Sequence, residues 1–252
     1  MDVRFLDKKY QVVVLSSPYS LLSDPLVRSR FLDICNLKIE GYSKEYPEGV
    51  LPFDTTDFIA NHVVLCEKSP EGLRPLMGFK SVDLATCDFH RVALPIFGML
   101  KGGDVSPQHA TYFEEMAASY RQKGRSAGLA YNGSFTVHPS ARADKTFMSM
   151  MWDLGFFLTA GHYLTEGTDK VVAVCATKFK VDSKKLERGW TYCEAGGTQL
   201  NAYHAYGLFE AELIPMELTD IQTRCRSYFD PFALLWENRI IHRKDRQIAI
   251  AA

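Results

Sequence analysis

The chain has 252 residues, of which 46% are hydrophobic and 23% charged, and its formal net charge is −1. This composition is that of an ordinary globular protein, and the length suits one large domain or one domain with an extension. A net charge near zero gives no broad basic field, so we expect no nucleic-acid partner. The six cysteines show no close pairing, which argues against a zinc motif and a small disulfide framework. Reduced thiols and the lack of a membrane-spanning stretch indicate a cytoplasmic protein.

The N-terminal part predicts a short strand followed by a helix. Residues 10–15 are apolar and suit a strand or an edge piece. A helix should begin at Asp24 and Pro25, because Asp caps helices and Pro suits their first position. One face of this helix carries the apolar residues Val27, Phe31, Ile34 and Leu37. Arg28 and Arg30 lie among them, and their residue type alone predicts a solvated face.

A polar loop and a hairpin come next. Residues 43–57 form a long loop, a length that is often functional in compact domains. The loop ends in two acids three residues apart, Asp54 and Asp57, which by themselves are equally typical of a turn or a helix cap. Residues 62–67 and 76–84 flank a turn and predict an antiparallel strand pair.

The central part predicts two helices around a strand. Residues 107–123 suit a helix, and residues 129–137 are apolar and β-branched. His138 and Pro139 should end that strand, because proline cannot continue a ladder. The next helix is indicated by apolar residues at spacings of three and four, namely Phe147, Met150, Met151, Leu154 and Leu158.

The C-terminal part predicts further strands and helices. Residues 171–176 form an apolar strand, and residues 182–188 suit a short helix that closes at Gly189 and Trp190. Residues 202–213 alternate loosely as a strand, which Pro215 should end. Two further helices are expected, over residues 218–226 and 232–241, before a basic tail over residues 242–246.

The central order of strand, helix, strand and a helix ending in Gly-aromatic resembles the acyl-CoA-binding core of the GNAT superfamily of N-acetyltransferases. Val137, Pro139 and Arg142 fit the phosphate-loop pattern of that family, whereas Lys145 and Phe147 occupy its two glycine positions. The resemblance implies an α+β fold, an α/β/α sandwich with a mixed, mostly antiparallel central sheet. It also implies a splayed strand pair in that sheet and helices on both faces.

The resemblance implies one GNAT-like acyltransferase domain over residues 1–252. Within it, residues 1–57 would form an N-terminal helix and loop on the acceptor side. Residues 58–215 would form the core sheet and the acyl-donor site, and residues 216–252 a C-terminal helical extension.

The N-terminal half resembles two groups more closely: long-chain N-acyl amino acid synthases and acyl-homoserine-lactone (autoinducer) synthases. Both have a basic helix, two acids three residues apart and a strand pair, and both lack the glycine-rich phosphate loop. The lactone synthases place Glu-Arg-Ser-Arg-Phe on the central strand, where this chain has Tyr, Asn, Gly, Ser and Phe at residues 131–135. The acid and both arginines are missing, so N-acylation of an amino acid or another amine is the better interpretation.

The resemblance implies a transferase that moves an acyl group from a phosphopantetheine thioester to the amine of an amino acid or a similar small acceptor. The donor would be acyl carrier protein or acyl-coenzyme A, bound as a substrate, with no permanent cofactor and no metal. An acetyl-CoA-dependent small-amine acetyltransferase and a non-catalytic module that binds an acyl carrier or lipid stay open as alternatives. A carrier protein is acidic, so Arg121, Lys123 and Arg125 are its candidate contacts. The only membrane association expected is a weak one through the product.

The same resemblance assigns the candidate site. The donor arm would lie along the central strand and the following helix start, contacting Ser134, Phe135, Thr136, Val137, Arg142, Ala143, Lys145 and Thr146. Arg28 or Arg30 would bind the acceptor carboxylate, and Asp54 and Asp57 its amine. Tyr131, Glu194 and Asp54 are the candidate catalytic groups, because amide formation needs a proton acceptor.

The resemblance bears on one further position, and the residues of the long helix bear on another feature of the site. Lys185 stands where the superfamily often has a tyrosine that protonates the leaving thiolate, so that role is unfilled or has moved. The residues Phe147, Met148, Met150, Met151, Trp152, Phe156 and Phe157 would line an acyl tunnel or, more simply, pack as a core helix.

Overall fold

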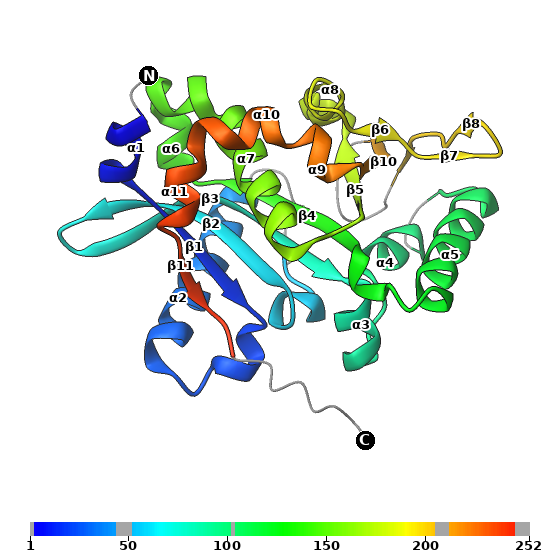
Figure 1. The fold of residues 1–252 in the computed structure, drawn as a ribbon, viewed down its shortest axis with the longest axis horizontal. Coiled ribbons are helices and arrows are strands. Elements are labelled where there is room, and N and C mark those ends of the chain that lie inside the picture. The colour runs from blue at the N-terminus through cyan, green and yellow to red at the C-terminus, as the bar shows by residue number, and fades with distance from the viewer. Residues whose placement is uncertain (1–2, 44–51, 102–103, 205–211, 245–252) are drawn as a thin grey trace.

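A nine-stranded mixed sheet runs through the molecule (Figure 1). The computed structural model describes residues 3–43, 52–101, 104–204 and 212–244. The sheet order is β11-β1-β2-β3-β4-β5-β10-β6, and β9 also pairs with β10. The strands are β1 (Tyr10–Ser16), β2 (Asn61–Ser69), β3 (Gly72–Asp83), β4 (Leu129–Val137), β5 (Lys170–Ala176), β6 (Thr191–Tyr192), β9 (Tyr203–His204), β10 (Glu212–Thr219) and β11 (Ile240–His242). β4–β5 and β1–β11 are parallel and the other pairs are antiparallel, which confirms the predicted mixed, mostly antiparallel sheet.

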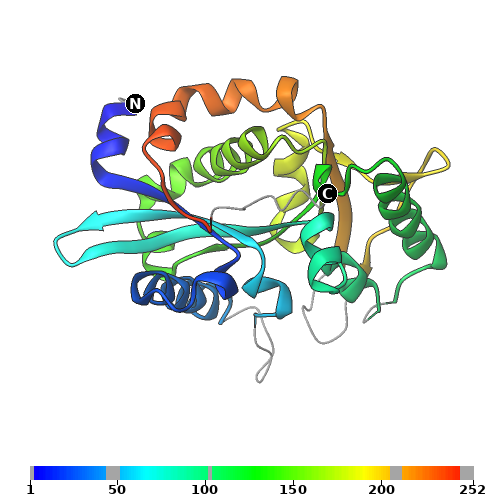
Figure 2. The ribbon, with the colours of Figure 1, turned by 60° about the horizontal axis from the view of Figure 1, so that its bottom comes forward.

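Helices cover both faces of the sheet, as predicted (Figure 2). One face carries α7 (Lys145–Glu166) and the C-terminal helices α9 (Ile221–Arg224), α10 (Arg226–Phe229) and α11 (Ala233–Glu237). The opposite face carries α2 (Pro25–Tyr42) and α3 (Leu84–His90). The remaining elements are α1 (Val3–Lys9), α4 (Pro95–Lys101), α5 (Pro107–Gln122), α6 (Pro139–Ala143), α8 (Val181–Leu186) and the hairpin β7 (Glu194–Ala195) and β8 (Thr198–Gln199).

The two long helices begin where the sequence predicts. The Asp24 carboxylate accepts hydrogen bonds from backbone N–H groups in the first turn of α2, and Asp144 does the same for α7. These caps satisfy N–H groups that have no partner inside the helix. α7 ends at Gly167, whose φ of 65° suits a residue without a side chain. α7 packs into the main apolar core, and α2 packs into a smaller one against β1 and β2.

The prediction that Pro215 ends its strand is wrong, because Pro215 lies inside β10 opposite Val174 of β5. Its carbonyl oxygen accepts from the Cys193 N–H, on the β6 side of β10. In a strand, the N and O atoms of one residue point to the same edge. The missing N–H of Pro215 therefore faces the β6 side, where the β6 ladder starts only at Met216, and no bond to β5 is lost.

The predicted helix over 232–241 is also partly wrong. Only α11, Ala233–Glu237, is an α-helix there, and Ile240–His242 forms β11, parallel to β1. Ile240 and Ile241 suit an edge strand as well as the apolar face of a helix, so the sequence pattern could not decide between strand and helix. Part of the predicted strand 202–213 lies outside the described residues. Within the described ranges, no helix combines the length and the apolar character that crossing a bilayer requires.

Candidate functional site

The parallel strands β4 and β5 part halfway along their length. They pair from Leu129 to Asn132 on β4 and from Lys170 to Ala173 on β5. β4 then continues to residue 137 and β5 to residue 176 without pairing with each other. The backbone groups of β4 that face this gap have no strand partner there. The predicted splayed strand pair is therefore present.

A bulge in β4 accompanies the parting. Against β3, Thr136 pairs with Gly78 and Gly133 pairs with Lys80, so Ser134 and Phe135 both lie opposite one residue of β3. Ser134 has a φ of 55°, in the left-handed region that non-glycine residues rarely adopt. A bulge bends its strand and re-aims the side chains that follow. It therefore provides a local cause for the turn of β4 away from β5.

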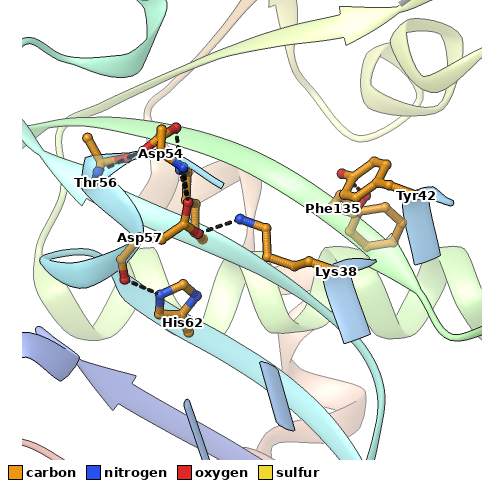
Figure 3. A network of polar contacts seen from close by, with 8 residues as sticks. Lys38, Tyr42, Asp54, Thr56, Asp57, His62 and Phe135 are labelled. Carbon is orange, nitrogen blue, oxygen red and sulfur yellow. Dashed lines mark hydrogen bonds and ion pairs between the residues drawn. The ribbon is translucent and has the colours of Figure 1, made fainter. Parts of the chain in front are cut away.

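Phe135 is held from both faces of the sheet. Its carbonyl oxygen accepts a hydrogen bond of 2.7 Å from the Tyr42 hydroxyl at the end of α2 (Figure 3). Its ring stacks on Trp152 of α7, with 5.8 Å between the centroids and 11° between the planes. Gly155 makes this packing possible, because a Cβ atom there would lie 2.9 Å from the Phe135 ring. The backbone beside the gap is thus rigidly placed.

A buried ion network lies on the α2 face of the same strands (Figure 3). Lys38 of α2 is ion-paired with Asp57, and the Lys80 ammonium lies 3.0 Å from Asp57 Oδ2 and 2.7 Å from Asp54 Oδ2. The side chains of Lys38, Lys80 and Asp57 are at most 4% exposed, whereas that of Asp54 is 51% exposed. Two ammonium groups face two carboxylates, so the network is electrically balanced and opens to solvent at Asp54.

The two acids form one cap. The Asp54 carboxylate accepts from the Thr56 N–H, and the Asp57 carboxylate accepts from the Asp54 N–H. Burial acts to raise the pKa of Asp57, but the adjacent ammonium groups outweigh it and lower the pKa to about 2. His62 bonds the Asp57 carbonyl through Nε2, and burial lowers its pKa to about 4. At neutral pH, Asp57 is therefore ionised and His62 is neutral.

The predicted acceptor residues are only partly brought together. Arg28 is exposed, and Arg30 donates to the Leu73 carbonyl at 3.2 Å and pairs with Asp33. Neither arginine joins the network, whose cation from α2 is Lys38. Sequence reasoning missed Lys38, although it continues the buried stripe of Val27, Phe31 and Ile34 at helical spacing. It also missed Lys80, whose charged side chain lies in the buried part of β3.

Comparison with known proteins identifies the fold. No protein-family model and no curated protein matches the chain. Among solved structures, FeeM, an N-acyl amino acid synthase from uncultured soil microbes, is 15% identical with a TM-score of 0.51, covering 90% of this chain and 98% of that one. The AHL synthase LasI is 9% identical with a TM-score of 0.53, covering 93% and 98%. A CoA-dependent acyl-homoserine lactone synthase, MesI, is 14% identical with a TM-score of 0.50, covering 93% and 100%.

This chain has the GNAT-type fold that these synthases share. The resemblance that the sequence indicated is thereby confirmed at the level of fold. In this GNAT-type fold, the parted strands and the bulge of β4 lie next to α7. The ion network lies on the opposite face of the sheet, beside α2.

Two of the predicted catalytic residues, Tyr131 and Glu194, differ in their exposure to solvent. Tyr131 is 2% exposed, and its hydroxyl donates to the Met99 sulfur at 3.4 Å. Burial raises the pKa of Tyr131 well above its usual 10, so its hydroxyl is protonated near neutral pH, and the role of Tyr131 as a base stays a prediction. Glu194 is exposed on β7 and lines an open groove with Gln108 and Thr111 of α5.

The helix start that should hold phosphate is partly occupied by the chain itself. Asp144 accepts from the N–H groups of Thr146 and Phe147, at 2.8 and 3.1 Å. Arg142 donates to the Gly41 carbonyl at 2.6 Å, and the neighbouring Lys145 is exposed. A carboxylate at this point repels a pyrophosphate, while one exposed ammonium can still meet a single phosphate.

The other donor-side residues lie beside these groups or on the parted strand. Thr136 and Val137 are buried on β4, Ser134 is half-buried, and Ala143 is exposed at the end of α6. On α7, Phe147, Met151, Phe156 and Phe157 are buried in the main core. Most of the predicted tunnel residues thus pack as a core helix, and the acyl tunnel stays a prediction.

The predicted carrier-protein contacts carry less net charge than the sequence indicates. Arg121 is ion-paired with Asp88, and Arg125 with Asp169. Lys123 is exposed on the same segment. Paired surface arginines still attract an acidic partner, but less strongly than free ones.

Proposed function

We propose that this protein is an N-acyltransferase that moves an acyl group from a phosphopantetheine thioester to the amine of an amino acid or a similar small acceptor. The observation that carries the proposal is the parting of β4 and β5 after Asn132 and Ala173, in a fold shared with N-acyl amino acid and acyl-homoserine lactone synthases. An extended pantetheine arm has amide groups that can pair with the free backbone of β4, as an added strand would.

The donor proposed is acyl carrier protein in preference to acyl-CoA. Asp144 occupies the first N–H groups of α7, where a pyrophosphate would otherwise bind. Phosphopantetheine on a carrier protein has one phosphate, which Lys145 and the nearby Arg142 are sufficient to balance. Replacing Asp144 with Ser keeps a helix cap and removes the charge, so D144S should lower KM for acyl-CoA more than for acyl carrier protein.

The acceptor amine is proposed to bind at Asp54. It is the only acid of the ion network with an exposed carboxylate, since Asp57 is fully buried. Asp54 Oδ2 already contacts Lys80, but a carboxylate has room for a further donor. The amine must be neutral when it attacks, and a water can take its proton on the solvent side. Holding amine and thioester together supplies much of the rate.

The test is product analysis. The purified chain is incubated with acyl carrier proteins of several chain lengths, with acyl-CoA and acetyl-CoA, and with a mixture of amino acids, and new amides are measured by mass spectrometry. We expect long-chain N-acyl amino acids from the carrier protein. Amides from acetyl-CoA alone would instead indicate a small-amine acetyltransferase. Carrier binding by the folded protein without any amide would indicate a non-catalytic module.

A matched pair of variants tests the acceptor site. D54N should raise KM for the acceptor at least tenfold, because it removes the charge that binds the ammonium. D33N removes an acid of α2 that pairs with Arg30 and should leave KM unchanged. Equal effects of the two variants would refute the role of Asp54.

A further inference from the structure

An amine of the protein itself lies at the inner end of the gap between β4 and β5. It belongs to Lys185, which lies in the last turn of α8 and is 8% exposed. The Nζ atom is 3.4 Å from Oδ1 of Asn132, the last residue of β4 that pairs with β5. The side-chain nitrogen of Lys185 is therefore placed where the two strands begin to part.

The surroundings of this nitrogen favour the neutral amine. Among the described residues, no carboxylate forms an ion pair with Lys185, and a second contact is the Trp190 ring, 3.4 Å from Nζ to the centroid. The ring attracts the charged form, but it replaces lost hydration less fully than a carboxylate does. Burial lowers the pKa of Lys185 to about 8, against a smaller opposing effect of the Cys175 thiol. Near neutral pH, the uncharged nucleophile is about a hundredfold more abundant than for an ordinary lysine.

Two unused hydrogen-bond donors belong to the side chains around this amine. Asn132 Nδ2 and Trp190 Nε1 are buried and have no hydrogen-bond partner among the described residues. Both side chains contact the Lys185 nitrogen. Buried donors are nearly always paired, so an acceptor from outside the chain is expected at this point. The carbonyl oxygen of an acyl thioester, brought into the gap by its pantetheine arm, is such an acceptor.

We propose that Lys185 is a modification site: when no acceptor amine is present, its nitrogen takes the acyl group from the bound donor and becomes an Nε-acyl-lysine. This inference rests on the thioester-binding gap of the function proposed above. The Nζ lone pair forms a bond to the acyl carbon, and the bond between that carbon and the sulfur breaks. Nζ gives one proton to solvent and the leaving thiolate takes one from solvent, so the products are a secondary amide and a free thiol.

The modification makes the enzyme sensitive to the supply of acceptor. A thioester held in the gap lies close to the Lys185 nitrogen, and proximity alone accelerates such a transfer strongly. The product is an amide that stays in the protein, and its acyl chain occupies the gap that the next donor arm needs. An acceptor amine that captures the acyl group first protects Lys185. A donor without an acceptor therefore inactivates the protein.

The groups that face Lys185 from the neighbouring elements do not compete with it as nucleophiles. Burial raises the pKa of Cys175 on β5 and of Tyr163 on α7, so both stay protonated over the range in which Lys185 loses its proton. Tyr192 of β6 also has a raised pKa, from burial and from its hydrogen bond of 3.1 Å to Asp182 of α8. Acylation that increases as the pH rises through about 8 is therefore assigned to Lys185.

The experiment incubates wild type, Lys185→Met and Lys184→Met with a carrier protein that bears a long acyl chain, with and without a mixture of amino acids. Lys184 is the matched control, because it is the partly exposed neighbour on α8, paired with Glu187. Intact mass and peptide mapping locate any added acyl group. Hydroxylamine separates a stable amide on lysine from a labile thioester on Cys175, and thermal unfolding checks that each variant is folded. An unreactive acyl-pantetheine amide serves as a competitor for the gap.

Without amino acids, wild type and Lys184→Met should each gain a single hydroxylamine-resistant acyl group on Lys185, and the competitor should prevent it. The rate of this gain should rise with pH and level off above about 8, because the neutral amine reacts. Lys184 of the wild type should react about a hundredfold more slowly, since its amine is mostly charged. Lys185→Met should gain no such group. Incubation of the wild type with donor alone should lower its later amide formation in proportion to the modified fraction, and amino acids present from the start should prevent this loss.

Acyl groups spread over surface lysines, or gained equally by wild type and Lys185→Met, would overturn the assignment. A hydroxylamine-labile group would move the acyl acceptor to Cys175. Formation of N-acyl amino acids by a protein whose Lys185 stays unmodified without acceptor would refute the modification and leave the N-acyltransferase function intact. Acylation of Lys185 without acylation of any supplied amine would instead refute the proposed function and leave the modification standing. A folded wild type that does not bind the donor would refute both.

Discussion

Asn132 of β4 and Ala173 of β5 are the last two residues through which these parallel strands pair, and the bulge at Ser134 begins two residues beyond Asn132. The parting and the bulge belong together, because a strand that bends cannot stay in register with a straight neighbour. The gap that results is bordered by Phe135 on β4 and by Lys185 at its inner end. The proposed donor site depends on this relationship.

Packing around Phe135 depends on the small size of Gly155. Gly155→Ala should lower the free energy of unfolding by about 1–3 kcal/mol, since its Cβ would lie 2.9 Å from the Phe135 ring and 3.3 Å from Met77. Urea denaturation measures the change. Gly98 of α4 is the matched control, because no atom lies within 4 Å of a Cβ there. Gly98→Ala should gain about 0.5–1 kcal/mol, and a loss at Gly98 equal to that at Gly155 would contradict the packing argument.

The ion network should make Asp57 the most sensitive of the polar residues near α2. Asp57→Asn leaves two buried ammonium groups with one exposed carboxylate, and should cost about 3–5 kcal/mol of unfolding free energy. Asp54→Asn, at a half-exposed position, should cost about 1 kcal/mol or less. Chemical denaturation of both variants at pH 7 checks the contrast. Equal losses would show that burial does not govern this network.

The lowered pKa of Asp57 predicts that the stability of the protein falls at acidic pH. The folded pKa of Asp57 is about 2, below its value of 3.8 without interactions, so its contribution is fully present above pH 4. It is lost as the pH falls from about 4 to 2, by about 2–3 kcal/mol. Unfolding curves of wild type and Asp57→Asn should therefore converge over this range. Curves that stay parallel would exclude the lowered pKa.

The lowered pKa of Lys185 predicts a second pH-dependent change in stability, at alkaline pH. Its folded pKa of about 8 lies below 10.5, so above pH 8 the folded state gives up a proton that the unfolded state keeps. Stability of wild type relative to Lys185→Met should therefore rise between about pH 8 and 10.5, on the order of 3 kcal/mol. A flat difference would mean that the ammonium is solvated in the folded protein.

Much of the fold could be predicted from the sequence because its signals are local. The caps Asp24 and Asp144, and the proline after β4, fix element ends through contacts within a few residues. Pro215 was misleading because its effect depends on which edge of β10 its nitrogen faces. That orientation is set by β5 and β6, which lie elsewhere in the chain.

The candidate site was predicted less completely, since burial of a charge is a tertiary property. Asp54 and Asp57 stand out in sequence, but only the structure shows that one is exposed and the other enclosed. Lys38 and Lys80 belong to a residue type that usually lies on the surface. The network that buries them joins α2, residues 54–57 and β3. Lys185 was left without a role because its position relative to Asn132 depends on the packing of α8 beside the gap.

The most direct measurement of the central claim is hydrogen exchange of the backbone with and without a bound donor analogue. A carrier protein is loaded with an acyl-pantetheine amide that cannot react, and exchange is followed by mass spectrometry. The account predicts that peptides covering residues 133–137 of β4 and 174–176 of β5 gain protection at least tenfold, while those covering β2 do not. Binding of the analogue with unchanged exchange at residues 133–137 would contradict it.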